Sequence, residues 1–302
     1  MVPRALIALV LATAPAPSAE TIADALARLS EEAEAFALIA PQVLSQETCR
    51  QKAAKVQRGL HLGAAPAPGA PPQLSFRVRE ITSEYGFAAL QDSKDGLHEF
   101  RRVISVDGRS IETASEARRK LSLALADPGD RERRRLLRDF ERWGLEGAVT
   151  DFGQTILLFV RRRLADYQFT PGESGRIGPD QAHAINFRQS GGTQAFRIFD
   201  RGDQVVHQPL EGRVWVRDSD SLPLRIELRS VRKQERRSLV DVAVIDYAMS
   251  AHGALLPASV LHRGYVGEHM VVENSLQYST FRRFAASAEI KFTESDEPPP
   301  KN

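Results

Sequence analysis

The sequence predicts an α+β protein in which one large antiparallel sheet follows an N-terminal helical segment. Apolar residues recur at spacings of three and four between residues 22 and 40, which is typical of an amphipathic helix. From Leu74 onward they alternate with polar residues, and short runs of this kind, separated by turn residues, continue to the end of the chain. Such a succession of short strands forms either a barrel or a partly open sheet.

Composition excludes several classes of protein. The 302 residues carry 41 basic and 39 acidic side chains, a net charge of +2 that lacks the one-sided field of a nucleic-acid binder. Apolar residues at 42% and charged residues at 26% argue against a polytopic membrane protein and against wholesale disorder. The single cysteine, Cys49, excludes an intramolecular disulfide framework and a cysteine-built zinc site.

The first nineteen residues have the layout of a secretory signal peptide. Arg4 gives a positive start, residues 5–14 form a short apolar run, and residues 14–19 are small or proline. The run is too short to span a bilayer, which needs about 20 apolar residues. We therefore expect an exported protein, periplasmic or secreted, whose mature chain has no transmembrane segment; the alternative is an ordinary amphipathic N-terminus of a cytosolic protein.

The next part of the chain, residues 20–62, reads as an N-terminal helical segment. A first helix ends at Pro41, and a second helical stretch from Val43 to Leu60 contains Cys49. We interpret Cys49 as a helix thiol without a role, the alternative being a redox-active or intermolecular disulfide thiol. Residues 63–73, rich in Pro, Ala and Gly, predict an extended linker and a domain boundary.

A hairpin and two helices are predicted after the linker. Strands around residues 74–78 and 98–106 are joined at residues 93–96, and the capping-box sequence 113–116 begins a helix that stops near Asp127. A further helix runs from Asp130 to about Trp143. The spacing favours placing these elements in one domain with the later strands, over residues 74–292.

The helix from Asp130 to Trp143 is strongly basic on one side and apolar on the other. Its apolar stripe consists of Leu136, Leu137, Phe140 and Trp143. The arginines that could meet an acidic partner or an anionic membrane are Arg131, Arg134, Arg135, Arg138 and Arg142. The alternative is a helix docked on the core with a solvated arginine face.

The C-terminal half is strand-like almost throughout. We expect a buried strand at residues 156–160, and further strands at the positions that follow: 185–187, 196–198, 214–216, 224–228, 240–247, 260, 271–284 and 290–292. In residues 240–247, both the odd-numbered and the even-numbered positions include apolar residues, so both faces of the strand are apolar, which predicts a central strand. Residues 293–302 are predicted to be a disordered tail.

Few residues point to catalysis. The sequence contains no Gly-x-Ser-x-Gly elbow, phosphate loop, dinucleotide fingerprint or His-Glu-x-x-His. His252, His262 and His269 could line one end of adjacent strands and hold a metal, although solvated or hydrogen-bonded structural histidines are the alternative. Ser174 lies in a Gly-Pro-rich loop and is a weak candidate nucleophile. We predict no catalytic residue, no metal site and no cofactor.

Residues 210–227, a glycine before a Trp-centred strand, an acidic turn and a returning Leu-Pro strand, resemble the periplasmic lipoprotein-carrier (LolA-like) superfamily. Residues 241–247 and the connection 253–257 resemble the next strand and turn of these proteins, and the resemblance covers roughly residues 150–292. It implies an open half-barrel, a strongly curved antiparallel sheet with helices on its concave side, around an apolar cavity for acyl chains. The same half-barrel serves in envelope-stress regulators that sense mislocalised lipoproteins. The length, the N-terminal helical pair and the segment 131–142 depart from the carriers.

Three functions are consistent with these patterns. The first is a non-enzymatic protein that binds a lipid, acyl chain or lipoprotein; apolar ligands bind such a cavity by burying area. The candidate lining residues are Phe159, Phe187, Phe196, Trp215, Ile226 and Tyr247, for each of which plain core packing is the alternative. The second is an envelope interaction or regulatory module that binds a protein partner through the basic helix. The third is a hydrolase within the histidine-bearing strands.

Overall fold

The computed structural model describes residues 19–55, 75–91, 96–143, 151–191, 198–199, 205–206, 209–234 and 237–284. Residues 1–18 of the predicted signal peptide, the predicted linker and the predicted tail lie outside these residues. Within the described part, no helix combines the length and apolar character needed to cross a bilayer.

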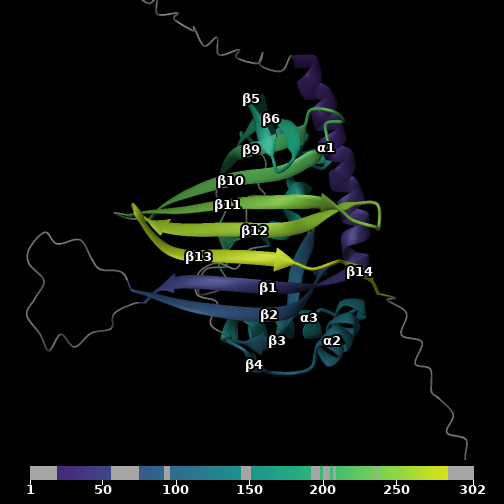
Figure 1. Ribbon diagram of the computed structural model, residues 1–302, viewed down its shortest axis with the longest axis vertical. Helices are drawn as coiled ribbons and strands as arrows, with labels where there is room; N and C mark the ends of the chain where they lie inside the picture. The colour runs from purple at the N-terminus through teal and green to yellow at the C-terminus, as the bar shows by residue number, and fades with distance from the viewer. Residues whose placement is uncertain are drawn as a thin grey trace, which may run out of the picture.

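One open antiparallel sheet of 12 strands dominates the fold (Figure 1). From edge to edge its strands are β4 (Arg109–Ser110), β3 (Leu97–Val106), β2 (Phe76–Ala89), β1 (Val43–Ala54), β13 (His269–Tyr278), β12 (Leu255–Val266), β11 (Arg237–Met249), β10 (Pro223–Gln234), β9 (Leu210–Arg217), β6 (Asp180–Gln189) and β5 (Tyr167–Ile177), with β14 (Arg282–Arg283) paired to β1. Strands β7 (Ile198–Phe199) and β8 (Val205–Val206) pair only with each other among the described residues. Because β4 and β5 end the strand order without pairing to one another, the sheet is not closed. The predicted fold class is confirmed.

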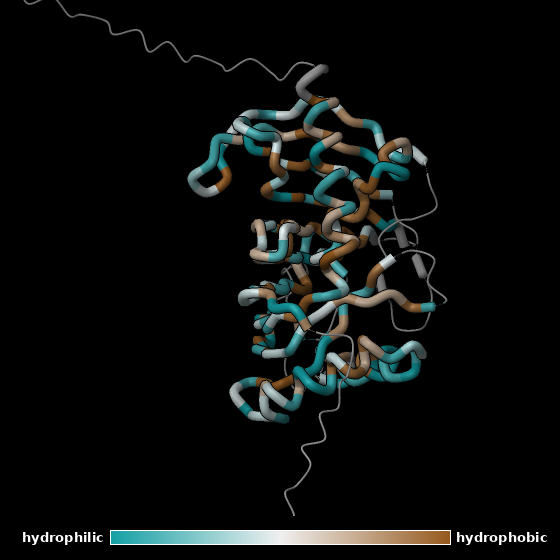
Figure 2. The backbone as a smooth tube through the Cα atoms, turned by 90° about the vertical axis from the view of Figure 1, so that its right-hand side faces the viewer, coloured by the Kyte–Doolittle hydropathy of each residue, from teal (hydrophilic) through white to brown (hydrophobic). Residues whose placement is uncertain are grey.

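Helix α1 (Ala19–Ile39) packs across one face of the sheet, which we call the inner face (Figures 1 and 2). Its buried apolar side chains recur with helical spacing and are fully inaccessible: Ala25, Leu29, Ala33 and Phe36. Pro41 then falls in the short 3-10 turn η1 (Ala40–Gln42), where the helix ends as predicted.

Helices α2 (Ala114–Ala126) and α3 (Arg131–Arg142) cover the β2–β3 end of the sheet. Thr113 caps α2 with the predicted capping box. Along β2, residues that face inward alternate with residues that face the opposite, outer side of the sheet. Gly86 is one of the outward residues and lies against Leu125 of α2, so α2 covers the outer face. Helix α3 lies beside β3 at the edge of the sheet and contacts both faces. Its Leu136 packs with Phe100 on the outer face, whereas its Phe140 packs with residues of the inner face.

The predicted second helix, from Val43 to Leu60, is wrong over its described part. Residues 43–54 form β1, which lies in the middle of the sheet between β2 and β13. The segment 20–62 therefore does not stand apart from the sheet, and Cys49 is a buried strand residue. Several inward positions of β1 are polar, among them Glu47 and Gln51, so the apolar residues alone do not show the period of two.

The strand predicted at residues 156–160 is also wrong. These residues belong mainly to η2 (Phe152–Phe159), a 3-10 segment followed by η3 (Arg161–Asp166). A run of five apolar residues reads alike as a buried strand or as a buried helical segment. In the folded chain it packs on the inner face of the sheet and does not pair within it.

A glycine in β9 allows two strands to approach closely. A Cβ atom on Gly212 would stand 2.0 Å from the carbonyl oxygen of Glu227 on β10 and 2.9 Å from the ring of Phe187. We therefore expect Gly212→Ala to cost about 1–3 kcal/mol in the free energy of unfolding, because backbone must shift to admit the methyl group. Urea denaturation measures this; Gly129→Ala, whose Cβ would meet nothing closer than 3.5 Å, is the control and is expected to unfold at the wild-type midpoint.

Candidate functional site

The inner face of the sheet carries three of the six residues predicted to line an apolar cavity. Phe187, Ile226 and Tyr247 belong to the main core cluster and project from β6, β10 and β11. They share this face because strand register places them on the same side as the fully buried Ile185 and Val214. The structure thus brings these three predicted residues onto one continuous wall.

Phe159, predicted as a wall residue, lies instead on η2, the segment that covers the wall. Its ring packs edge-on against Phe187 with centroids 5.1 Å apart, and both Phe159 and Ile156 are fully buried. Eight residues is long for a 3-10 helix, whose hydrogen bonds have poorer geometry than those of an α-helix. The inner concavity is therefore occupied by side chains of the chain's own η2 and α1.

A small set of hydrogen bonds tethers η2 to the sheet. The Tyr247 hydroxyl donates to Gly153 O at 3.2 Å and accepts from Ile156 N at 3.0 Å, while Gln154 N donates to Glu99 Oε1 at 3.2 Å. A Cβ atom on Gly153 would stand 2.6 Å from the Tyr85 hydroxyl and 2.9 Å from Glu99, so only glycine fits there without displacement. The beginning of η2 is thus held by polar contacts and the rest of it by apolar packing.

A buried charged cluster supports these contacts. The Arg101 Nε atom donates to Glu47 Oε1 at 2.7 Å, and its Nη2 atom donates to Glu47 at 2.8 Å and to Glu99 at 2.8 Å. All three side chains are at most 3% exposed. Burial raises the pKa of Glu99 to about 8 although Arg101 opposes the shift, so near neutral pH this carboxyl is mostly protonated.

Two predicted lining residues do not join the wall. Trp215 faces outward, in a separate cluster with Ala182 and Ala184, and its Nε1 atom donates to Glu227 at 2.9 Å. Its strand neighbours Val214 and Val216 face inward, so the alternation along β9 excludes Trp215 from the inner face. Phe196 lies outside the described residues.

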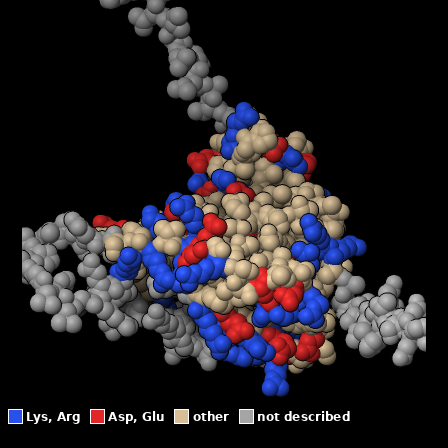
Figure 3. Space-filling view, turned by 60° about the horizontal axis from the view of Figure 1, so that its bottom comes forward, with Lys and Arg blue, Asp and Glu red and all other residues tan. Residues whose placement is uncertain are grey.

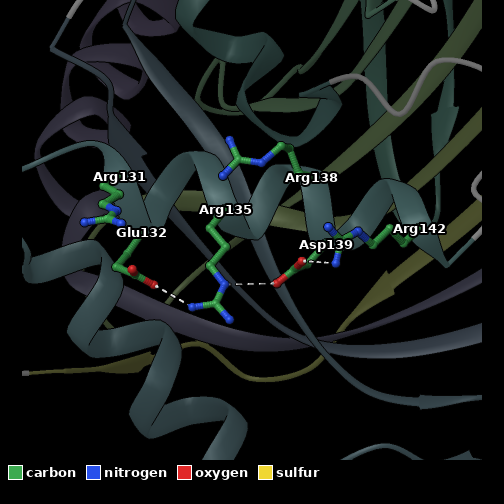
Figure 4. Close-up of a pocket in the computed structure, with 6 residues that line it drawn as sticks. All are labelled: Arg131, Glu132, Arg135, Arg138, Asp139 and Arg142. Carbon is green, nitrogen blue, oxygen red and sulfur yellow. Dashed lines mark ion pairs between the residues drawn. The ribbon is translucent and has the colours of Figure 1, made fainter.

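Four of the five predicted arginines line one depression on α3. Arg131, Arg135, Arg138 and Arg142 surround about 370 Å³ together with Glu132 and Asp139 (Figure 4). Arg135 lies 3.7 Å from each of the two acidic side chains, and Arg142 lies 3.3 Å from Asp139. The fifth, Arg134, is half-buried and pairs with Asp130 at 3.7 Å, outside the depression.

Two further depressions adjoin the first. One of about 510 Å³ lies between α2 and α3, and one of about 300 Å³ lies beside Phe140 and Trp143. Figure 3 shows side chains of both charges interspersed over the end of the molecule that carries α2 and α3. This surface combines a cationic rim with apolar floor residues.

The predicted histidine set does not gather. His262 is fully buried and bonds Asp241 at 3.0 Å, whereas His252 lies 3.0 Å from Phe281 O. His269 begins β13 and is exposed. Across the described residues, no group of three His, Cys, Asp or Glu side chains is placed to hold a metal.

The candidate nucleophile lies near a hydrogen-bonded pair of a histidine and an aspartate. Ser174 stands opposite His183 in the β5–β6 register, and His183 Nδ1 lies 2.8 Å from Asp218. Yet the His183 Nε2 atom is buried without a hydrogen-bond partner, and Ser174 is exposed. The hydrogen bond from Ser174 to His183 that nucleophilic catalysis requires is therefore not formed.

Sequence reasoning missed the residues of the charged cluster. In the strand predicted at residues 98–106, one face was assigned from the apolar residues Phe100 and Ile104. In the structure, the residues that face inward are Glu99, Arg101 and Val103. Opposite the consecutive residues Thr82 and Ser83, the partners on β3 are Ser105 and Val103, so β3 carries one extra residue and Val106 also turns inward. Charged residues alternating with apolar ones on a strand normally indicate a solvated face, and nothing local marks Arg101 as the exception.

No protein-family model matches the chain, and a search of curated proteins finds no match. Among solved structures, the chain aligns with the crystal structure of the LolA superfamily protein NE2245 from Nitrosomonas europaea, at 13% identity and a TM-score of 0.31. The alignment covers 85% of this chain and 92% of that chain. This is a weak resemblance at the level of fold, and it says nothing of what the present chain binds.

Proposed function

We propose that the protein is an exported, non-enzymatic binding protein that holds the acyl chain of a lipid or lipoprotein against the inner face of its half-barrel. The observation that carries the proposal is η2: an apolar 3-10 segment, tethered by few hydrogen bonds, occupies the concavity in front of Phe187, Ile226 and Tyr247. In the bound state the acyl chain takes the place of η2, and the sheet keeps its form.

Burial of an acyl chain acts against the loss of the contacts that η2 makes with the sheet. Each methylene group buried contributes about 0.8 kcal/mol, whereas a hydrogen bond of the kind that tethers η2 contributes a net ~1 kcal/mol. A long acyl chain can therefore offset both the tether and part of the packing of Ile156 and Phe159. A short chain cannot, which gives the site a preference for long chains.

Native mass spectrometry of the protein purified without detergent tests the proposal. We expect a discrete added mass that is lost on denaturation and recovered in a lipid extract. A bare protein that also fails to take up a phospholipid with a pyrene-labelled acyl chain would contradict the proposal.

A substitution in η2 sharpens this test. Gly153→Ala places a methyl group against Tyr85 and Glu99, so we expect it to loosen η2 and to raise the rate of pyrene-lipid uptake several-fold. Gly129→Ala, in an open position before α3, is the matched control and is expected to leave the rate unchanged. Equal rates for the two variants would show that η2 does not limit entry.

A second candidate function is an envelope interaction module that binds a protein partner through α3. Three adjoining depressions around the arginines of this helix favour it. Reversal of charge at Arg131 and Arg138 is expected to abolish capture of that partner while the far-ultraviolet circular dichroism spectrum stays unchanged.

A further inference from the structure

The three depressions form one groove along α3. The 510 Å³ depression shares Arg135 and Asp139 with the first, and the 300 Å³ depression shares Asp139 and Arg142 with it. Two large apolar side chains in the groove are exposed: Ile111 at 42% and Leu123 at 48%. A groove with exposed apolar residues and a charged rim fits an amphipathic segment better than it fits a bare ion.

The rim has unbalanced positive charge. Arg135 and Arg142 are paired with Glu132 and Asp139 at 3.3–3.7 Å. No carboxylate whose side chain is described forms an ion pair with the other two rim arginines, Arg131 and Arg138. They are seven residues apart on α3, which places them on the same side of the helix about 10 Å apart. An acidic segment with carboxylates at similar separation would complement them.

The chain itself contains such a segment just beyond the described fold. Residues 289–297, Glu-Ile-Lys-Phe-Thr-Glu-Ser-Asp-Glu, carry four acidic side chains, one lysine and two large apolar side chains. Phe284, where the described residues end, packs against the cluster that contains Leu136 of α3. The chain therefore leaves the fold beside the groove, and at about 3.3 Å per extended residue the segment has ample reach.

We propose that residues 289–297 dock in the groove along α3 of the same molecule, with Ile290 and Phe292 against its apolar floor and the acidic residues at Arg131 and Arg138. Covalent attachment gives the segment an effective concentration of about 1 mM, so an intrinsic Kd of that order suffices to occupy the groove. The inference rests on the second candidate function, that this surface binds acidic segments, and adds that the chain's own tail competes with a partner for it.

Paramagnetic relaxation in the full chain tests the proposal. A nitroxide is attached at Ser295→Cys; Cys49 stays unlabelled because it is buried, and burial raises its pKa to about 12. We expect the methyl signals of Leu123 and Leu136 to relax several-fold faster than in the reduced, diamagnetic sample. The methyl signals of Ile177, on the strand at the opposite edge of the sheet, are expected to be unaffected.

Two double variants supply the control. Arg131→Glu with Arg138→Glu is expected to abolish the enhanced relaxation, whereas Arg50→Glu with Arg188→Glu, exposed positions on β1 and β6, makes the same change in net charge and is expected to retain it. Absence of selective relaxation, or relaxation that grows with protein concentration and so reports the tail of a second copy, would overturn the proposal. If the full chain binds an added peptide of residues 285–302 without prior relaxation at Leu123, the inference fails while the second candidate function stands.

Discussion

Arg101→Met is expected to lower the free energy of unfolding by about 3–5 kcal/mol, because removing one partner of a buried ion pair leaves an uncompensated charge in the core. The guanidinium is the common partner of Glu47 and Glu99, and its removal leaves both carboxyl groups buried without a basic partner. It also lies between the rings of Tyr85 and Phe140, with centroids 5.0 and 5.1 Å away, so the packing of α3 against the sheet weakens as well. Urea denaturation followed by circular dichroism measures the loss.

The neighbouring arginine is the matched control. Arg102 faces the other side of the same strand, is 28% exposed and pairs with Glu112. Arg102→Met is expected to cost at most ~1 kcal/mol, because solvent screens a partly exposed pair. If the two variants unfold at the same urea concentration, the buried cluster contributes no more to stability than a partly exposed ion pair, and the role assigned to Arg101 is wrong.

The second large effect is a dependence of stability on pH that originates at Glu99. Burial raises the pKa of Glu99 from its ordinary value of 4.5 to about 8 in the folded protein. Because the folded value exceeds the unfolded one, the contribution of this carboxyl to stability is complete below pH 4.5 and is lost as the pH rises to about 8. Above pH 8 the folded protein must hold the Glu99 carboxylate in its buried, charged form.

Glu99→Gln isolates this contribution, since an amide does not titrate. We expect the variant to gain stability relative to wild type as the pH rises from about 5 to about 8.5, by several kcal/mol over the whole range. When its single amide oxygen accepts from Gln154 N, the variant loses the bond that Glu99 Oε2 accepts from Arg101 Nη2; this loss does not depend on pH and leaves the pH-dependent difference intact. Urea midpoints of both proteins at intervals of pH measure the difference; a difference independent of pH would contradict the assignment.

The elements that could be predicted from the sequence are those whose pattern is local. The stripe of α1, the capping box at Thr113, the basic stripe of α3 and the alternation of β10 each report a helix or strand within about a dozen residues. The open sheet followed from the regular succession of such strands. Its order did not, because the insertion of β1 between β2 and β13 joins residues more than 200 positions apart.

Two of the failures, the helix predicted in place of β1 and the missed charged cluster, have one physical cause, which is that polar residues occupy buried positions. Glu47 and Gln51 point inward from β1 because Arg101 and Asn274 meet them there from other strands. A pattern of hydrophobicity treats such residues as exposed, and it assigned β1 to a helix for that reason. The buried cluster of Glu47, Glu99 and Arg101 was missed on the same ground.

The candidate site was only partly predictable. The alternation of β6, β10 and β11 placed Phe187, Ile226 and Tyr247 on one wall, and alternation along β9 already separates Trp215 from its inward neighbours. The segment that covers the wall was not predictable, because the apolar run of η2 reads equally well as a strand. The arginine face of α3 was visible in the sequence, whereas the depressions around it depend on how α2 packs beside α3.

Hydrogen–deuterium exchange with and without a bound long-chain phospholipid tests most directly whether an acyl chain takes the place of η2. We expect peptides covering η2 (Phe152–Phe159) to exchange faster in the lipid complex, because the acyl chain displaces this segment, while peptides covering β6, β9 and β10 exchange at the same rate or more slowly. Unchanged or stronger protection of η2 in a complex whose lipid is confirmed by mass would contradict the proposed function, because the lipid would then bind elsewhere and η2 would be a permanent part of the core.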